Sequence, residues 1–250
     1  MNYFAHRSAA ERYAKARPYF HPLVLEKIAA RYPSRLPFDK ALDVGCGTGN
    51  STKALLVVAN NVTGTDISDE MLAFAEPHPR IRYLNAPAEA LPFANAHFGL
   101  ITTCMAFHWF DQGKFLAEAR RVVRADGLLV IYGHGFTGEM AGNPKFAEWN
   151  SEYLLRYPAP PRPPAFVEVP ANSGFIEKEP ERFQHQLELS PRTLAEYLLT
   201  QSNVINRVER GEAGLESTMD WILTSVTSLF PGPAARFHFH GHIRYFEPAQ

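Results

Sequence analysis

Cysteine, charge of one sign and long apolar runs are all scarce in this chain, and each shortage excludes a class of protein. Only Cys46 and Cys104 are present, so we expect free thiols in a reducing compartment and no disulfide framework. The formal net charge of −1 gives no basic excess for a nucleic-acid backbone. No run approaches the roughly 18 apolar residues of a membrane span, and residues 1–20 lack the apolar core of a secretory signal. These shortages favour a cytoplasmic enzyme or binding protein.

What the chain does contain is a regular alternation of short apolar runs and amphipathic segments. We predict helices at 3–16 and 21–32, then strands at 40–44, 62–67, 80–85, 98–104 and 128–132, separated by helices at 50–59, 68–76 and 112–123. Five strands that alternate with helices indicate a parallel, doubly wound α/β sheet. Such sheets bind ligands beyond the carboxyl ends of their strands.

The pattern loosens after residue 133. We predict a helix at 145–157, a strand at 183–189, helices at 190–202 and 217–229, and a final strand at 236–246. The expected fold is a single domain, 1–250, with a Rossmann-like, seven-stranded, doubly wound sheet that is mostly parallel and has its last strand antiparallel. Its expected parts are an N-terminal helical lid at 1–33, a ligand-binding core at 34–133, a variable substrate-side segment with helices at 134–235, and the final strand at 236–246.

A glycine-rich turn lies between the first of these strands and the helix after it. Residues 42–49 read Leu-Asp-Val-Gly-Cys-Gly-Thr-Gly, and the three glycines let backbone approach a ligand closely. The helix start adds unpaired N–H groups, which suit a phosphate, a carboxylate or ribose oxygens. The spacing is G-x-G-x-G, whereas dinucleotide sites use G-x-G-x-x-G, and Asn50 stands where the third dinucleotide glycine would fall.

Two carboxylates flank this turn. Asp43 precedes Gly45 by two positions, where it can fix loop amides and attract the ammonium of an amino-acid moiety. Asp66 ends the next strand, a place from which a carboxylate can accept both ribose hydroxyls. The alternative is that Asp66 only caps the helix that begins at Ser68, and the Ser68 side chain is itself a candidate N-cap.

These motifs resemble those of the class I S-adenosylmethionine-dependent methyltransferases. Leu42 to Gly49 matches the family's first motif, Val62 to Ser68 resembles its acidic second motif, and Ala88 to Phe93 resembles the segment beside the adenine. Within this family the chain most resembles the type 11 small-molecule branch and its trans-aconitate methyltransferase-like members. The residues that carry this closer resemblance are Tyr13, Arg17 and Pro18, together with His108 to Asp111.

The resemblance implies S-adenosylmethionine as methyl donor, S-adenosylhomocysteine as product, and no metal. The cofactor-binding residues that it implies are Asp43, Gly45, Cys46, Gly47, Gly49, Asp66, Ile67, Ala88, Glu89 and Met105. Pro87 departs from the family pattern, because proline has no N–H to donate where relatives commonly carry a polar residue.

Three residues are candidates for the chemistry of transfer. His108 follows the fourth strand and is a candidate base or substrate-orienting group, or else a loop histidine beside packed aromatic rings. Tyr13 and Arg17 are four residues apart and share one helical face. Arg17 could pair with the methionine carboxylate or an anionic substrate, and Tyr13 could close over the site; an amphipathic surface pair is the alternative.

His238, His240 and His242 alternate along the final strand, and we interpret them as a polar sheet face rather than a metal site.

The predicted function is methyl transfer to a small-molecule carboxylate, hydroxyl or amine, with a non-catalytic S-adenosylmethionine-binding protein as the alternative. The glycine spacing argues against a nicotinamide-dependent oxidoreductase, and the neutral charge argues against nucleic-acid methylation. No oligomeric state follows from the sequence.

Overall fold

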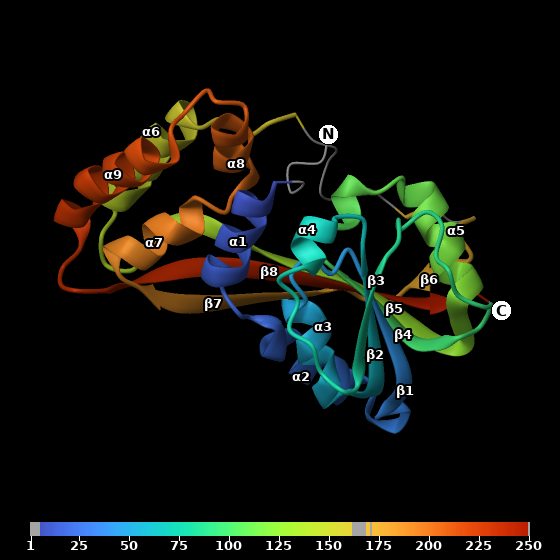
Figure 1. Cartoon of the computed structure of the whole chain (residues 1–250). Helices are drawn as coiled ribbons and strands as arrows, with labels where there is room; N and C mark the ends of the chain where they lie inside the picture. Colours follow the sequence, from blue (N-terminus) through green and yellow to red (C-terminus); the bar gives the residue numbers. More distant parts are fainter. Residues whose placement is uncertain (1–5, 162–168, 171, 250) are drawn as a thin grey trace. The chain divides into compact units, whose positions relative to one another are not determined.

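The computed structural model describes residues 6–161, 169–170 and 172–249 and divides the chain into two compact units. The core unit comprises Tyr19–Gly133, Arg162–Arg182 and His242–Gln250. The helical unit comprises Met1–Pro18, His134–Pro161 and Phe183–Gly241. Strands β5 (Val123–Met140) and β8 (Ala235–Pro248) are long enough to contribute residues to both units (Figure 1).

The core unit is built on a parallel sheet with the strand order β3-β2-β1-β4-β5. Its strands are β1 (Phe38–Val44), β2 (Ala59–Asp66), β3 (Ile81–Asn85), β4 (Phe98–Cys104) and the first part of β5, and neighbours among them pair in parallel. This confirms the doubly wound sheet expected from the sequence. The strand order reverses between β1 and β4, so the loops after these two strands meet at the edge where ligands bind in such sheets.

Helices cover both faces of this sheet. They are α2 (His21–Arg31), α3 (Asn50–Ala54), α4 (Asp69–Leu72) and α5 (Gln112–Val122). Ile131 of β5 belongs to a buried cluster with Phe115 of α5. The next residue, Tyr132, points to the opposite face, where its hydroxyl lies 3.1 Å from Nδ1 of His21 in α2. Burial on both faces explains why residues 128–132 of β5 are a continuous apolar run.

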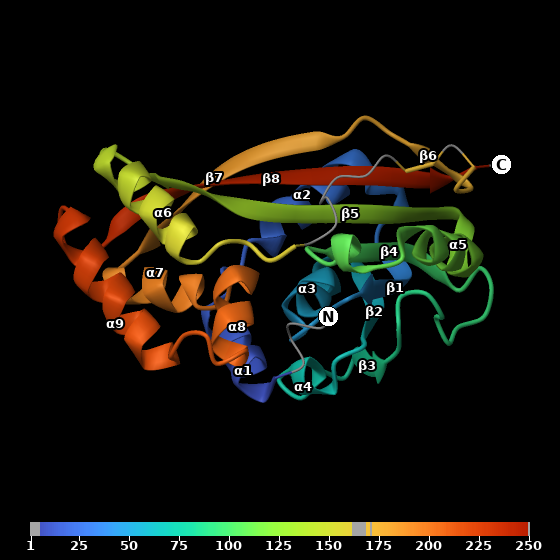
Figure 2. The ribbon, with the colours of Figure 1, turned by 90° about the horizontal axis from the view of Figure 1, so that it is seen from above.

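Three strands extend the sheet beyond β5: β8, and the strands β6 and β7 (Glu181–Leu189), which both pair with β8. A Cβ on Gly133 would meet His242 of β8, and one on Gly135 would meet His240, so β5 and β8 run in opposite directions (Figure 2). The short strand β6 (Phe175–Glu177) then pairs antiparallel with the end of β8.

The described residues therefore form eight strands, and the prediction of seven is corrected. The additional strand is β6. Three residues are too few to show an alternating pattern, and the backbone there is extended because it pairs with β8. Pairing has the same effect on β5, which runs from Val123 to Met140, well beyond the predicted 128–132, although four of its residues are glycines.

Five helices stand in the helical unit beside parts of three strands. They are α1 (Arg7–Ala16), α6 (Lys145–Arg156), α7 (Pro191–Leu198), α8 (Ser202–Glu209) and α9 (Leu215–Val226), and the strands are β5, β8 and most of β7 (Glu181–Leu189), which pairs with β8. Phe146, Trp149, Leu198, Ile222 and Phe237 belong to its apolar core. Residues 3–5 of the predicted first helix lie outside the described residues.

The predicted helix at 190–202 is two helices. Ser190 caps α7 with a reciprocal capping box to Thr193, as expected of a Ser-Pro start. The helix ends at Leu198, and the Thr200 hydroxyl donates to the carbonyl of Tyr197 at 2.6 Å. This local bond competes with continued helix, so the chain turns before α8 begins at Ser202.

Candidate functional site

The glycine loop joins β1 to α3 where the strand order of the core unit reverses. Gly45, Gly47 and Gly49 have φ angles of 70°, 55° and 81°, a left-handed conformation that residues with a Cβ rarely adopt. A Cβ on Gly45 would lie 2.6 Å from the Cβ of Ala106 and 2.9 Å from the Phe110 ring. Glycine is needed here because the loops after β1 and β4 are in contact.

The first amides of the loop point to the end of β2. Gly45 and Cys46 both donate to the carbonyl of Thr65, at 2.8 and 3.0 Å. The N–H of Gly47 donates to Oδ2 of Asp66 at 2.8 Å. The loop is thereby anchored to the acidic end of the neighbouring strand, and two of the motifs picked out from the sequence are brought into direct contact.

Asp43 lies beneath the loop, fully buried. Its carboxylate accepts hydrogen bonds from the hydroxyls of Ser51 at 2.6 Å, Thr52 at 2.8 Å and Thr102 at 3.0 Å. Burial raises its pKa to about 6 although the three hydroxyls favour the charged form. The prediction that Asp43 fixes the loop amides is wrong, because those amides have other acceptors and this carboxylate instead ties α3 to β4.

Asp66 stands at the end of β2 with its oxygens bound to backbone. Besides Gly47, the N–H of Ser68 donates to Oδ1 at 2.9 Å, and burial raises the pKa of the carboxyl. The cap of α4 is the Ser68 hydroxyl, which accepts the N–H of Met71 at 3.2 Å, as predicted. Ile67, between the two, is 64% exposed. The Asp66 carboxylate can therefore accept a further hydrogen bond, and it lies beside the exposed apolar side chain of Ile67.

The segment after β3 is tied to the elements around it. The N–H of Leu91 donates to Oε2 of Glu118 in α5 at 2.7 Å, and Glu89 accepts the N–H of Asp111 at 2.8 Å. Ala88 is buried beside the α5 side of the sheet. Glu89, predicted as a cofactor contact, thus links its own segment to the loop after β4.

The loop after β4 begins with a strained residue. Met105 has a φ of 57°, unusual for a residue with a long side chain, and its N–H donates to the carbonyl of Tyr132 at 3.0 Å. A short 3-10 turn follows, in which Phe107 is buried in the core. The rings of His108 and Trp109 are in contact, with centroids 4.5 Å apart. His108 thus lies at the carboxyl edge of the sheet, where the sequence placed it.

Tyr13 and Arg17 belong to the helical unit. The Arg17 guanidinium lies 4.6 Å from the centre of the Tyr13 ring and 5.7 Å from that of Tyr197, and it donates to the carbonyl of Thr200 at 2.8 Å. The predicted pair is therefore real as a contact at the end of α1. Its role toward a ligand stays a prediction.

The histidines of β8 behave as a polar face. Phe237 and Phe239 are buried, whereas His238 between them is half-buried and His240 is exposed. Within the part of the chain that the structure describes, no group of three or more His, Cys, Asp or Glu side chains is arranged to hold a metal ion.

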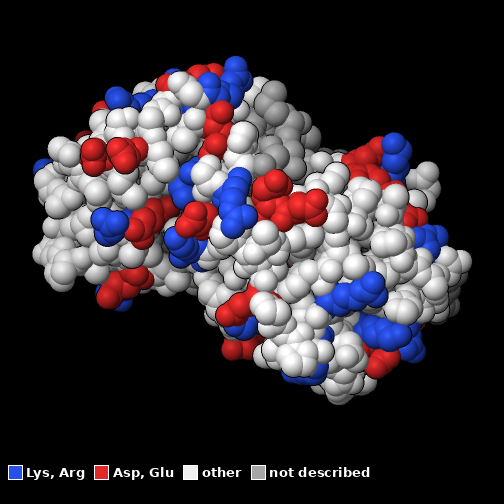
Figure 3. Space-filling view, viewed as in Figure 1, with Lys and Arg blue, Asp and Glu red and all other residues white. Residues whose placement is uncertain are grey.

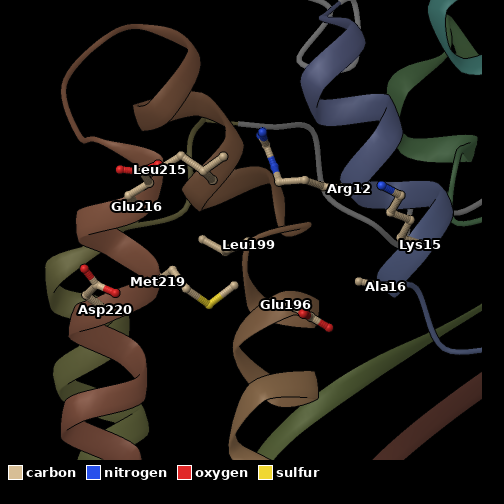
Figure 4. A pocket seen from close by; sticks show the side chains of 9 residues that line it. All are labelled: Arg12, Lys15, Ala16, Glu196, Leu199, Leu215, Glu216, Met219 and Asp220. Atoms are coloured by element: carbon tan, nitrogen blue, oxygen red, sulfur yellow. The ribbon is translucent and has the colours of Figure 1, made fainter.

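The helical unit also contains a cavity of about 610 Å³ between α1, α7 and α9 (Figure 4). Its lining consists of Arg12, Lys15, Ala16, Glu196, Leu199, Leu215, Glu216, Met219 and Asp220. No residue singled out from the sequence lines it. The cavity is apolar in the middle, where Leu199 and Met219 lie, and charged at its margins.

Surface charge follows the composition. On the face drawn in Figure 3, basic and acidic side chains are interspersed, as a net charge of −1 leads one to expect. No helix within residues 6–161, 169–170 and 172–249 combines the length and the apolar character needed to cross a membrane.

Sequence reasoning missed one residue of the site, Tyr83 of β3. A Cβ on Gly49 would collide with its hydroxyl, and a Cβ on Gly64 would lie 2.9 Å from its ring and 2.9 Å from the hydroxyl of Thr52. Gly64 was the available signal, because an isolated glycine within a strand often marks the close approach of another group.

Comparison with known proteins gives a consistent family. Residues 42–131 match the family described as methyltransferase domain. A candidate methyltransferase of Dictyostelium discoideum is 32% identical over 97 residues, which cover 39% of this chain and 37% of that protein. A malonyl-[acyl-carrier protein] O-methyltransferase of Pectobacterium atrosepticum is 35% identical over 108 residues, or 42% of each chain. These matches span less than half the length of the relatives.

One solved structure is similar over most of the chain. A candidate type II methyltransferase from Anaeromyxobacter dehalogenans superimposes with a TM-score of 0.66 and 26% identity, covering 88% of this chain and 94% of that one. Because 88% of the chain is covered, the likeness includes segments outside residues 42–131.

Proposed function

We propose that this chain, whose residues 42–131 form a methyltransferase domain of the class I kind, is an S-adenosylmethionine-dependent methyltransferase that acts on a small-molecule acceptor. The observation that carries the proposal is the direct bond from the Gly47 amide to Asp66, with Ile67 exposed beside it, at the place where the strand order reverses.

The described residues fit this cofactor. We propose that Asp66 accepts the ribose hydroxyls and that the exposed side chain of Ile67 packs against the adenine, with Ala88 and Glu89 on its other side. The three glycines let the loop lie close against its protein neighbours, and we propose that its backbone faces the remaining part of the molecule. Met105, held in a strained conformation after β4, would lie near the methionine end.

When bound, S-adenosylmethionine supplies an already activated methyl group, so the protein's task is to align the acceptor in line with the bond that breaks and to exclude water. We propose His108 as the residue that orients or deprotonates the acceptor. Tyr13 and Arg17 are proposed to serve the substrate side, with Arg17 as the partner of an anionic group. A carboxylate acceptor needs no base, whereas a hydroxyl or amine does.

The kind of acceptor is also a proposal. The Pectobacterium relative is named for O-methylation of a malonyl group, which supports an oxygen acceptor. The trans-aconitate-like branch, favoured by the motifs Tyr13 to Pro18 and His108 to Asp111, is consistent with a carboxylate. A small carboxylic acid is therefore the first acceptor class to test. The second candidate function is a protein that binds S-adenosylmethionine without turnover.

Calorimetric titration with S-adenosylmethionine tests the first step. We expect the native chain to bind, and Asp66→Asn to bind at least tenfold more weakly, a loss of about 1.4 kcal/mol or more. Asp126→Asn is a matched control, since Asp126 is exposed and pairs with Arg124 outside the site. An absence of binding by the native chain, or unchanged binding by Asp66→Asn, would contradict the proposal. Formation of S-adenosylhomocysteine with a panel of carboxylic acids separates the enzyme from the non-catalytic alternative.

A further inference from the structure

Two histidines from different strands of the helical unit lie side by side. His134 belongs to β5 and is buried, and His185 belongs to β7 and is half-buried. Nδ1 of His134 is 3.4 Å from Nε2 of His185, and the two rings are nearly parallel, with centroids 5.6 Å apart. Neither histidine was among the candidates picked out from the sequence.

The pair forms because the strand between them carries a glycine. The antiparallel register of β5 and β8 places His134 opposite Gly241, and Phe183 of β7 lies directly over that glycine, where any Cβ would collide with its ring. With no side chain at 241, an imidazole from each outer strand can lean over β8. Phe239, the next residue on this face, lies 5.4 Å from each of the two rings and is nearly parallel to both.

The distance between the two nitrogens decides what the pair is suited to. A hydrogen bond from a ring N–H is usually about 2.7–3.2 Å long, so 3.4 Å makes a poor one. Two imidazole nitrogens that each lie about 2.0–2.1 Å from one tetrahedral ion are separated by about 3.4 Å. The observed separation therefore fits two ligands of a single metal ion better than a short hydrogen bond between the rings.

Neighbouring aromatic rings hold the two imidazoles in place. Phe183 and Phe239 pack against the pair and limit rotation of the rings. Among nitrogen ligands, imidazole suits zinc, copper, iron and nickel rather than magnesium or calcium.

We propose that His134 and His185 together bind one divalent transition-metal ion of the Zn²⁺ type through Nδ1 and Nε2. No group of three ligating side chains occurs within the described part of the chain, so the proposed ion takes its remaining ligands from water. Such an open site exchanges its metal readily and has positions for a further ligand. It is separate from methyl transfer as proposed above, which uses no metal.

Titration of Zn²⁺ into tag-free protein, stripped with a chelator and followed by calorimetry, tests the proposal. We expect one ion per chain for the native protein and at least tenfold weaker binding for His185→Gln. The control is His240→Gln, which removes an exposed histidine of the same unit from the other face of β8 and leaves binding unchanged. Co²⁺ in place of Zn²⁺ is expected to give the visible absorption of a tetrahedral site, which His185→Gln abolishes.

Thermal melts without metal establish that each variant is folded, and His134→Gln serves as the test if His185→Gln is not. The proposal is overturned if the native chain shows no saturable Zn²⁺ binding, if the folded variant binds as tightly as the native chain, or if His240→Gln weakens binding equally.

Discussion

Replacement of Asp43 by asparagine tests the electrostatics beneath the glycine loop. The carboxyl is fully buried, and burial raises its pKa to about 6. Asparagine has the same shape, and the hydroxyls of Ser51, Thr52 and Thr102 can either donate to its oxygen or accept from its amide. The variant therefore removes the ionisation while it keeps the packing.

The sign follows from the direction of the pKa shift. In the unfolded chain the carboxyl ionises near pH 3.8, and in the folded chain near pH 6, so the folded state holds the proton more tightly. Asp43 therefore stabilises the fold less and less as pH rises from about 4 to about 6. A difference of about two pKa units corresponds to about 2–3 kcal/mol between pH 4 and pH 7.

Urea unfolding of both proteins at pH 4 and pH 7 measures this quantity. We take the free energy of unfolding of Asp43→Asn and subtract that of the native chain. This difference is expected to be about 2–3 kcal/mol larger at pH 7 than at pH 4, so the variant gains relative stability as pH rises. Subtraction cancels every titrating group that the two proteins share. The reasoning is refuted if this difference does not change with pH or changes in the opposite direction. Either result would mean that the three hydroxyls fully offset the cost of burying the charged carboxylate.

Two further predictions concern histidines of the core unit. Burial lowers the pKa of His21 to about 4, so the native fold should lose about 3 kcal/mol through this residue as pH falls from 7 to 4. Urea unfolding of His21→Gln should lack that loss. An equal loss in both proteins would show that the pKa of His21 is the same in the folded and unfolded states. For a hydroxyl or amine acceptor, His108→Ala should lower kcat by about 10²–10⁴-fold in an assay of S-adenosylhomocysteine formation, with S-adenosylmethionine affinity unchanged. Unaltered turnover would make His108 a structural residue.

The sequence was most informative where local and tertiary demands agree. Strands β1 and β4 are buried on both faces, so their apolar runs are unambiguous, and Phe98–Cys104 has the predicted bounds. The three glycines were recognisable because their positive φ angles admit few other residues. Ser68 as the cap of α4 followed from local hydrogen bonding alone.

The failures occurred where pairing or turning depends on distant residues. Strand β6 is extended only because β8 lies beside it, and three residues carry no periodicity. The break between α7 and α8 depends on one hydroxyl that donates to a backbone carbonyl. The partners of Asp43 were misjudged because the amides of the glycine loop and the hydroxyls of Ser51 and Thr52 are all within a few residues of it in the sequence.

The sequence by itself determined the class of sheet, the glycine loop and the acidic end of β2, since each depends on residues within a few positions of one another. Only the tertiary structure decided which groups meet: the Gly47 amide with Asp66, three hydroxyls with Asp43, and His134 with His185 across Gly241. The reason is that a strand's neighbours are chosen by the packing of the whole sheet, and distances between side chains on different strands follow from that choice.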